Sequence, residues 1–103
     1  MLYEWDERKN LENQRKHEGI SFELAALVFE DEDRLVGLDR VDKNGEQRWH
    51  AIGAVSVEGI PSAVLLVVHA YMENRDGEEV IRIISARRGE KHEIRRYREQ
   101  EMD

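Results

Sequence analysis

A chain of 103 residues, 40% hydrophobic and 38% charged, can bury one hydrophobic core but not two, so we expect a single domain over residues 1–103. The absence of cysteine excludes disulfides, thiol nucleophiles and thiolate metal sites. A formal net charge of −7 argues against direct nonspecific binding to nucleic acid. No apolar run approaches the roughly 20 residues that span a bilayer, so the sequence predicts a cytoplasmic protein.

The first third of the chain predicts a short strand and two helices. Residues 2–5 alternate between apolar and polar, as in a short edge strand, and Asp6 then suits a helix N-cap. Good helix formers fill 7–17, with so few aliphatic residues that this helix should lie mostly in solvent. Gly19 ends it and Ser21 caps a second helix. That helix should pack on a sheet through an apolar stripe of Phe22, Ala25, Ala26 and Phe29.

The remaining residues predict four strands and a last helix. Runs rich in Val, Ile and aromatic residues, separated by the turn segments 42–45, 58–61 and 74–77, predict strands at 34–41, 47–57, 62–72 and 79–87. Connections this short require an antiparallel meander. Residues 63–68 are apolar on both faces, which indicates that the third meander strand is central. With a helix at 89–100, the sequence predicts an α+β fold.

The sequence holds no Gly-rich phosphate loop, HExxH motif or Cys/His metal spacing, so we expect no metal and no cofactor. The Arg, Lys, His, Glu and Tyr side chains that remain are enough to cleave RNA without a metal. A base can activate the ribose 2′-OH, guanidinium groups can stabilise the phosphorane, and an acid can protonate the leaving 5′ oxygen.

The first candidate group follows the turn at Gly45. Strand alternation puts Glu46 and Arg48 on one face and Trp49 on the other. Arg48 could hold a phosphate while Glu46 transfers a proton or orients Arg48. The alternative is a cross-strand ion pair beside a core Trp.

The second candidate group lies at the end of the last strand. Alternation places Arg82 and Arg87 on opposite faces. A buried or rim Arg needs a carboxylate, a carbonyl group or a phosphate, and we assign a structural partner or a phosphate to Arg82 and a substrate phosphate to Arg87. Arg87 also begins a cluster at 87–98, where six Arg or Lys face two Glu. This cluster could bind RNA through Arg88, Lys91 and Arg95, could be a solvated helix face, or could dock an acidic partner.

Five further residues carry titratable side chains. Lys16 and His17, at the end of the first helix, could place a cation and an imidazole near that phosphate, or could belong to a solvated face. Tyr97 could stack on a base or lend its hydroxyl, or could pack in the core. We interpret His50 and His69 as structural, with His69 a hydrogen-bonded interior residue.

Taken together, these blocks resemble the BrnT toxin family, in chain order over nearly the whole sequence. The residues that carry the resemblance are Asn13, Lys16-His17, Gly19-Ile20-Ser21-Phe22-Glu23, Gly45-Glu46-Gln47-Arg48-Trp49 with Gly53, and Arg82-Ile83-Ile84-Ser85-Ala86-Arg87 with Glu93 and Tyr97. The resemblance implies a RelE-like fold, a metal-independent endoribonuclease that halts translation, and a BrnA-like antitoxin with a ribbon-helix-helix domain. DNA contact would then come through the antitoxin, and the complex could contain a toxin homodimer.

Two departures from the family pattern shape the functional hypotheses. Many relatives carry a His shortly before the Gly-Glu turn, where this chain reads Arg40-Val41-Asp42-Lys43, and Glu18 is inserted between His17 and Gly19. The leading hypothesis is a ribonuclease in which Arg48 and Arg87 hold the scissile phosphate, while His17, Lys16 or Glu46 transfers protons. The alternatives are a degenerate scaffold that only binds an antitoxin as co-repressor, and a ribosomal accessory protein.

Overall fold

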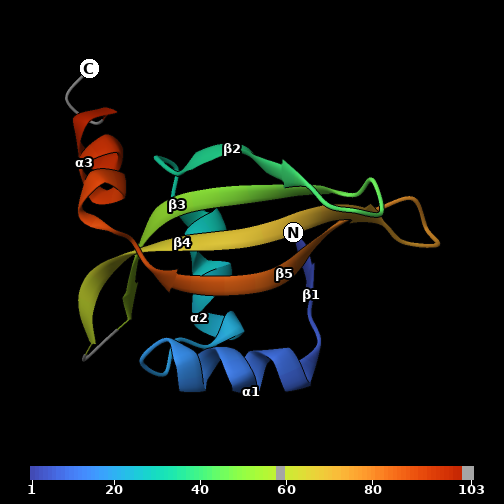
Figure 1. Ribbon diagram of the computed structural model, residues 1–103, viewed down its shortest axis with the longest axis horizontal. Coiled ribbons are helices and arrows are strands. Elements are labelled where there is room, and N and C mark those ends of the chain that lie inside the picture. Colours follow the sequence, from blue (N-terminus) through green and yellow to red (C-terminus); the bar gives the residue numbers. More distant parts are fainter. Residues whose placement is uncertain (58–59, 101–103) are drawn as a thin grey trace.

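The computed structural model describes residues 1–57 and 60–100 and shows an α+β fold around one mixed sheet (Figure 1). The elements in chain order are β1 Leu2–Glu4, α1 Glu7–Lys16, α2 Phe22–Ala26, the 3₁₀-helix η1 Leu27–Glu30, β2 Leu35–Val41, β3 Gln47–Val57, β4 Ile60–Glu73, β5 Glu79–Arg88 and α3 Lys91–Gln100. The N-caps Asp6 and Ser21 are confirmed, because their side chains accept from the backbone N–H groups of Lys9 and Leu24.

The sheet has the order β1-β5-β4-β3-β2. The predicted antiparallel meander of β2 to β5 is confirmed, with β4 at the centre. The expected short N-terminal strand is present as β1, which joins the meander at the edge as a fifth strand parallel to β5, with Tyr3 beside Ile81, so the whole sheet is mixed. Tyr3 and Trp5 pack against the core, which holds this three-residue strand at the edge.

The second helix differs from the prediction. It is α-helical only to Ala26 and then tightens into η1. Here Val28 lies so close to β3 that a Cβ on Gly53 would come within 2.8 Å of Val28 Cγ1. This close approach leaves no room for a larger residue than glycine at position 53. Of the predicted turn at 58–61, residues 58–59 lie outside the described residues and residues 60–61 belong to β4.

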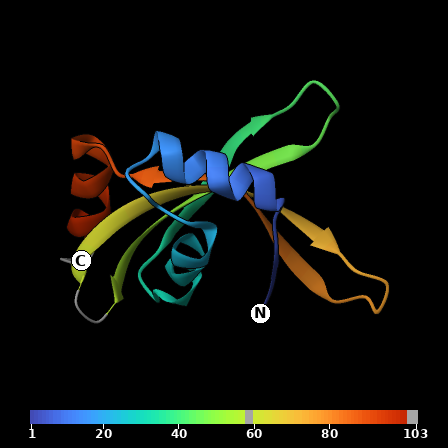
Figure 2. The same cartoon turned by 90° about the horizontal axis from the view of Figure 1, so that it is seen from below.

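Helices cover the two faces of the sheet unequally (Figures 1 and 2). α2 and η1 bury the main core against one face, through residues such as Phe22, Val28, Val67 and Ile83. On the other face, Tyr97 of α3 packs over Ile52 and Leu66 near one end of the sheet. The rest of this second face carries Arg48 and His50 of β3 and Arg82 of β5, beside apolar β4 residues such as Val68 and Ala70.

α1 docks through buried amides rather than apolar residues, as expected for a helix with so few of them. Asn13 Nδ2 donates to the Ile20 and Ala86 carbonyl oxygens at 2.9 Å, and the Ala86 N–H donates back to Asn13 Oδ1 at 3.1 Å. Asn13 thus pairs with the edge of β5 beyond the point where β1 stops. This contact fixes the end of α1 next to the end of β5.

A β-bulge in β5 changes which face its arginines occupy. Val68 is opposite Ser85, while the next residue, His69, is opposite Ile83, so Ile84 is an extra residue. The prediction that Arg82 and Arg87 lie on opposite faces is therefore wrong. Arg82 pairs with Ala70 and Arg87 with Leu66 on β4, and these two partners are four residues apart, so their side chains point to the same face of the sheet. Both arginines therefore lie on the face that α3 partly covers.

Candidate active site

A pocket of about 230 Å³ opens where α1 ends beside the end of β5. We call it the α1–β5 pocket, and its lining residues are Lys16, His17, Glu18, Ile20, Arg87 and Arg88. Four of the predicted site residues, Lys16, His17, Arg87 and Arg88, therefore meet here. The lining holds three cationic side chains and one carboxylate, and Glu93 pairs with Arg87 from outside the lining.

The turn after α1 brings these residues together. The His17 N–H donates to the Asn13 carbonyl oxygen at 2.9 Å, and the next two residues, Glu18 and Gly19, have φ angles of 54° and 80°. Glu18 thus adopts a left-handed conformation that a non-glycine residue rarely takes. Its carboxylate accepts from Arg88 Nε at 2.6 Å across the mouth of the pocket.

Arg87 is oriented from α3. Its Nη1 and Nη2 donate to the two carboxylate oxygens of Glu93 at 2.7 and 2.9 Å, and Nη1 also donates to the Arg88 carbonyl oxygen. Three of the five guanidinium N–H groups are thereby used within the described residues. The Nε–H and one Nη2–H make no hydrogen bond to the described residues, although Nη2 lies 3.6 Å from the Glu90 carboxylate.

Electrostatics reinforce this pair. Hydrogen bonds from Arg87 lower the pKa of Glu93, although desolvation acts the other way. The same hydrogen bonds raise the pKa of Arg87. Glu93 also accepts from the Glu90 N–H at 2.7 Å, which caps the first turn of α3. We assigned no role to Glu93 from the sequence, although its position three residues after the N-cap Glu90 is typical of a capping box.

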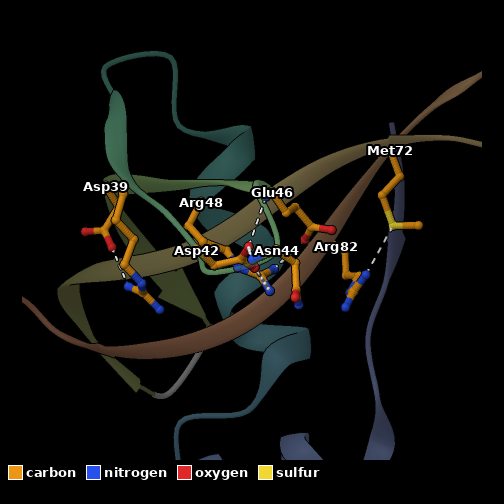
Figure 3. A network of polar contacts seen from close by, with 8 residues as sticks. Asp39, Asp42, Asn44, Glu46, Arg48, Met72 and Arg82 are labelled. Atoms are coloured by element: carbon orange, nitrogen blue, oxygen red, sulfur yellow. Dashed lines mark hydrogen bonds and ion pairs between the residues drawn. The ribbon is translucent and has the colours of Figure 1, made fainter.

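Arg48 and Glu46 form a separate polar network at the β2–β3 hairpin (Figure 3). Arg48 donates to Glu46 at 2.7 Å and to Asp42 at 3.0 Å, and it is mostly shielded from solvent. Backbone N–H groups of Glu46 and Asn44, together with Arg48, lower the pKa of Asp42. Asp42 therefore serves as an ion-pair partner of Arg48.

Arg48 and Arg87 do not converge on one phosphate. Arg87 is opposite Leu66, and Arg48 is one position past Trp49, which is opposite His69, so Arg48 lies beside Ala70. Four residues along β4 and two strands across correspond to about 16 Å between the Cα atoms of the arginines. The expectation that they grip one phosphate together is wrong, because each meets its own carboxylates in its own part of the sheet.

The other predicted site residues lie outside the α1–β5 pocket. Tyr97 is buried and its hydroxyl donates to Asp31, which also accepts from the Ala54 N–H. This gives Tyr97 a packing position that ties α3 to the sheet. Lys91 and Arg95 are exposed and line a shallow hollow of about 500 Å³ along the outside of α3. Arg82 lies on β5 and donates to Met72 Sδ at 3.9 Å.

The two strand histidines differ from one another. His50 Nδ1 lies 3.5 Å from Asp39, and its ring covers Gly37. His69 is fully buried edge-on between Phe29 and Tyr71. The expectation of a hydrogen-bonded interior His69 holds for one nitrogen only: Nδ1 lies 3.4 Å from the Val67 carbonyl oxygen, whereas Nε2 has no partner among the described residues. Desolvation lowers the pKa of His69 to about 4.

Comparison with known proteins identifies the family. In the part of the chain that the structure describes, no helix is long and apolar enough to cross a membrane. A search of curated proteins found no match. The family model for the ribonuclease toxin BrnT of type II toxin–antitoxin systems matches residues 5–93, a range that includes all the residues that line the α1–β5 pocket. The chain therefore belongs to the BrnT family of ribonuclease toxins.

Proposed function

We propose that this chain is a metal-independent endoribonuclease whose active site is the α1–β5 pocket. The observation that carries the proposal is the meeting of Lys16 and His17 from α1 with Arg87 and Arg88 from β5 in one solvent-accessible pocket. These groups supply an imidazole and three cations without a metal. RNA phosphates are the ligands that such a set of charges recognises.

The chemistry follows from these groups. His17 takes the proton from a ribose 2′-OH, and the 2′ oxygen attacks the adjacent phosphorus. Arg87, through its two remaining N–H groups, and Arg88 stabilise the charge on the phosphorane. Lys16 donates a proton to the 5′ oxygen as the P–O5′ bond breaks, which leaves a 2′,3′-cyclic phosphate and a 5′-OH.

The wider function rests on the family and on these charges. We propose a RelE-like cytoplasmic toxin that cuts RNA, inhibits translation and is neutralised by a BrnA-like ribbon-helix-helix antitoxin. The acidic chain contacts DNA only through this antitoxin, and two toxin copies assemble with the antitoxin dimer.

One experiment tests the enzyme. Purified chain without a partner should degrade single-stranded RNA and leave 2′,3′-cyclic phosphate ends detectable by mass spectrometry. Its induction in cells should arrest growth. Arg87→Lys keeps the charge but loses the paired hydrogen bonds and should lower cleavage at least tenfold. Intact RNA after incubation with stoichiometric folded protein would refute the enzyme.

A second candidate function is a non-enzymatic co-repressor that only binds the antitoxin. The observation that favours it concerns Arg48, one of the two arginines expected to hold the scissile phosphate. Arg48 is instead ion-paired with Asp42 and Glu46. The same RNA assay separates the two, because a co-repressor binds its antitoxin tightly and leaves RNA intact.

A further inference from the structure

The bulge at Ile84 creates a second cationic position on the sheet face that carries Arg87, outside the α1–β5 pocket. It turns Arg82 to the face that carries Arg87, and Arg82 stands opposite Ala70. Arg48 lies on the other side of Ala70, so Arg48 and Arg82 flank one small residue in a row across β3, β4 and β5. Figure 3 shows both arginines beside the β2–β3 hairpin.

Arg82 differs from the other arginines of this face in its partners. Arg40, Arg48 and Arg87 each have a carboxylate within 4 Å. Within residues 1–57 and 60–100, Arg82 has no ion pair, and its side chain donates only to the weak acceptor Met72 Sδ at 3.9 Å. It is also half-buried. A guanidinium without a strong acceptor in the protein keeps its donors for the phosphate of a ligand.

We propose that Arg82 is a second phosphate-binding group, which holds an RNA strand at a phosphate distant from the scissile one. This rests on the proposed cleavage at the α1–β5 pocket. The β4 partners of Arg82 and Arg87 are four residues apart, which corresponds to about 13 Å along the strand. The two arginines therefore contact different phosphates of one strand, and RNA runs along β5 across the open sheet face.

The surrounding charges make Arg82 the group that binds here. Two carboxylates, Asp42 and Glu46, already pair with Arg48 and balance its charge, so it attracts a phosphate less than Arg82 does. Glu4 of β1 is opposite Arg82 in the sheet but makes no ion pair with it among the described residues. Its negative charge opposes a phosphate, so Glu4→Gln should tighten RNA binding.

The test compares substrates of different length. A dinucleoside monophosphate has only the scissile phosphate, whereas an octanucleotide also reaches Arg82. We expect Arg82→Gln to cleave the dinucleotide at the wild-type rate and to bind a 2′-O-methyl octanucleotide, which cannot be cleaved, about tenfold more weakly by fluorescence anisotropy. The slope of log Kd against log salt should fall by about 0.7, as for one lost phosphate contact on a single strand.

Matched variants complete the experiment. Arg8→Gln removes the same charge from the exposed side of α1 and should leave octanucleotide binding unchanged. Arg82→Lys should restore most of the salt slope. An Arg82→Gln variant that binds the octanucleotide like Arg8→Gln, or that loses dinucleotide cleavage equally, would overturn the subsite while leaving the ribonuclease intact. A wild-type protein that neither binds nor cleaves either RNA would overturn both proposals.

Discussion

Glu93, in the first turn of α3, forms a bidentate ion pair with Arg87, with N–O distances of 2.7 and 2.9 Å. The same carboxylate caps α3 through the Glu90 N–H. One buried side chain thus joins the start of the last helix to the cation that we place on the scissile phosphate.

We predict that Glu93→Gln lowers both stability and catalysis. The neutral amide can accept only one of the two hydrogen bonds from Arg87, so the free energy of unfolding should fall by about 2 kcal/mol in urea titrations. kcat should fall more than KM rises, because a misoriented Arg87 loses contacts to the transition state first. Glu99→Gln, an exposed change on the same helix, is the control and should alter neither quantity. Unchanged kcat in Glu93→Gln would rule out the orienting role.

His17→Ala tests the proposed base. The imidazole lines the α1–β5 pocket, and loss of a general base costs about 100-fold or more in rate. Single-turnover cleavage of an oligonucleotide measures this loss. His92→Ala is the matched control, since His92 is exposed on α3 outside this pocket. Equal rates for the two variants would exclude His17 as the base.

Asn13→Ala should be among the most destabilising single changes in α1. It removes three hydrogen bonds and leaves the N–H and carbonyl of Ala86 and the Ile20 carbonyl without their amide partner. We expect a loss of about 3 kcal/mol in the free energy of unfolding. Asn44→Ala, at an exposed turn position, should change stability by less than about 0.5 kcal/mol. A loss as small in Asn13→Ala would mean that α1 does not depend on this contact.

His69 should make the protein sensitive to acid. Its pKa is about 4 when folded against 6.5 for the free side chain, so the unfolded chain binds the proton first as the pH falls. Stability is therefore complete above the unfolded pKa and is lost as the pH falls towards the folded one. From about pH 7 to about pH 5 the free energy of unfolding should decrease by about 2 kcal/mol. His69→Phe, which suits the aromatic surroundings, should flatten this part of the pH curve, and an equally steep curve in the variant would contradict the assignment to His69.

Local sequence patterns determined the elements of this protein. The caps Asp6 and Ser21, the alternating strands and the apolar run in β4 predicted the helix starts, the antiparallel meander and its central strand. These features depend on residues close together in the chain, so a single sequence contains the information. The sequence also suggested that Lys16 and His17 could lie near Arg87, and the three side chains line the same pocket.

Only the tertiary structure decided how the arginines are used. Alternation assumes a regular pleat, and the single extra residue Ile84 reverses the face of Arg82. With 16 basic and 23 acidic residues, charge alone cannot select Glu93 for Arg87 or Asp42 for Arg48. Those choices depend on where distant segments meet, as do the parallel edge strand β1 and the docking of Asn13 on β5. Long-range packing, rather than local pattern, therefore positions the cations of the proposed site.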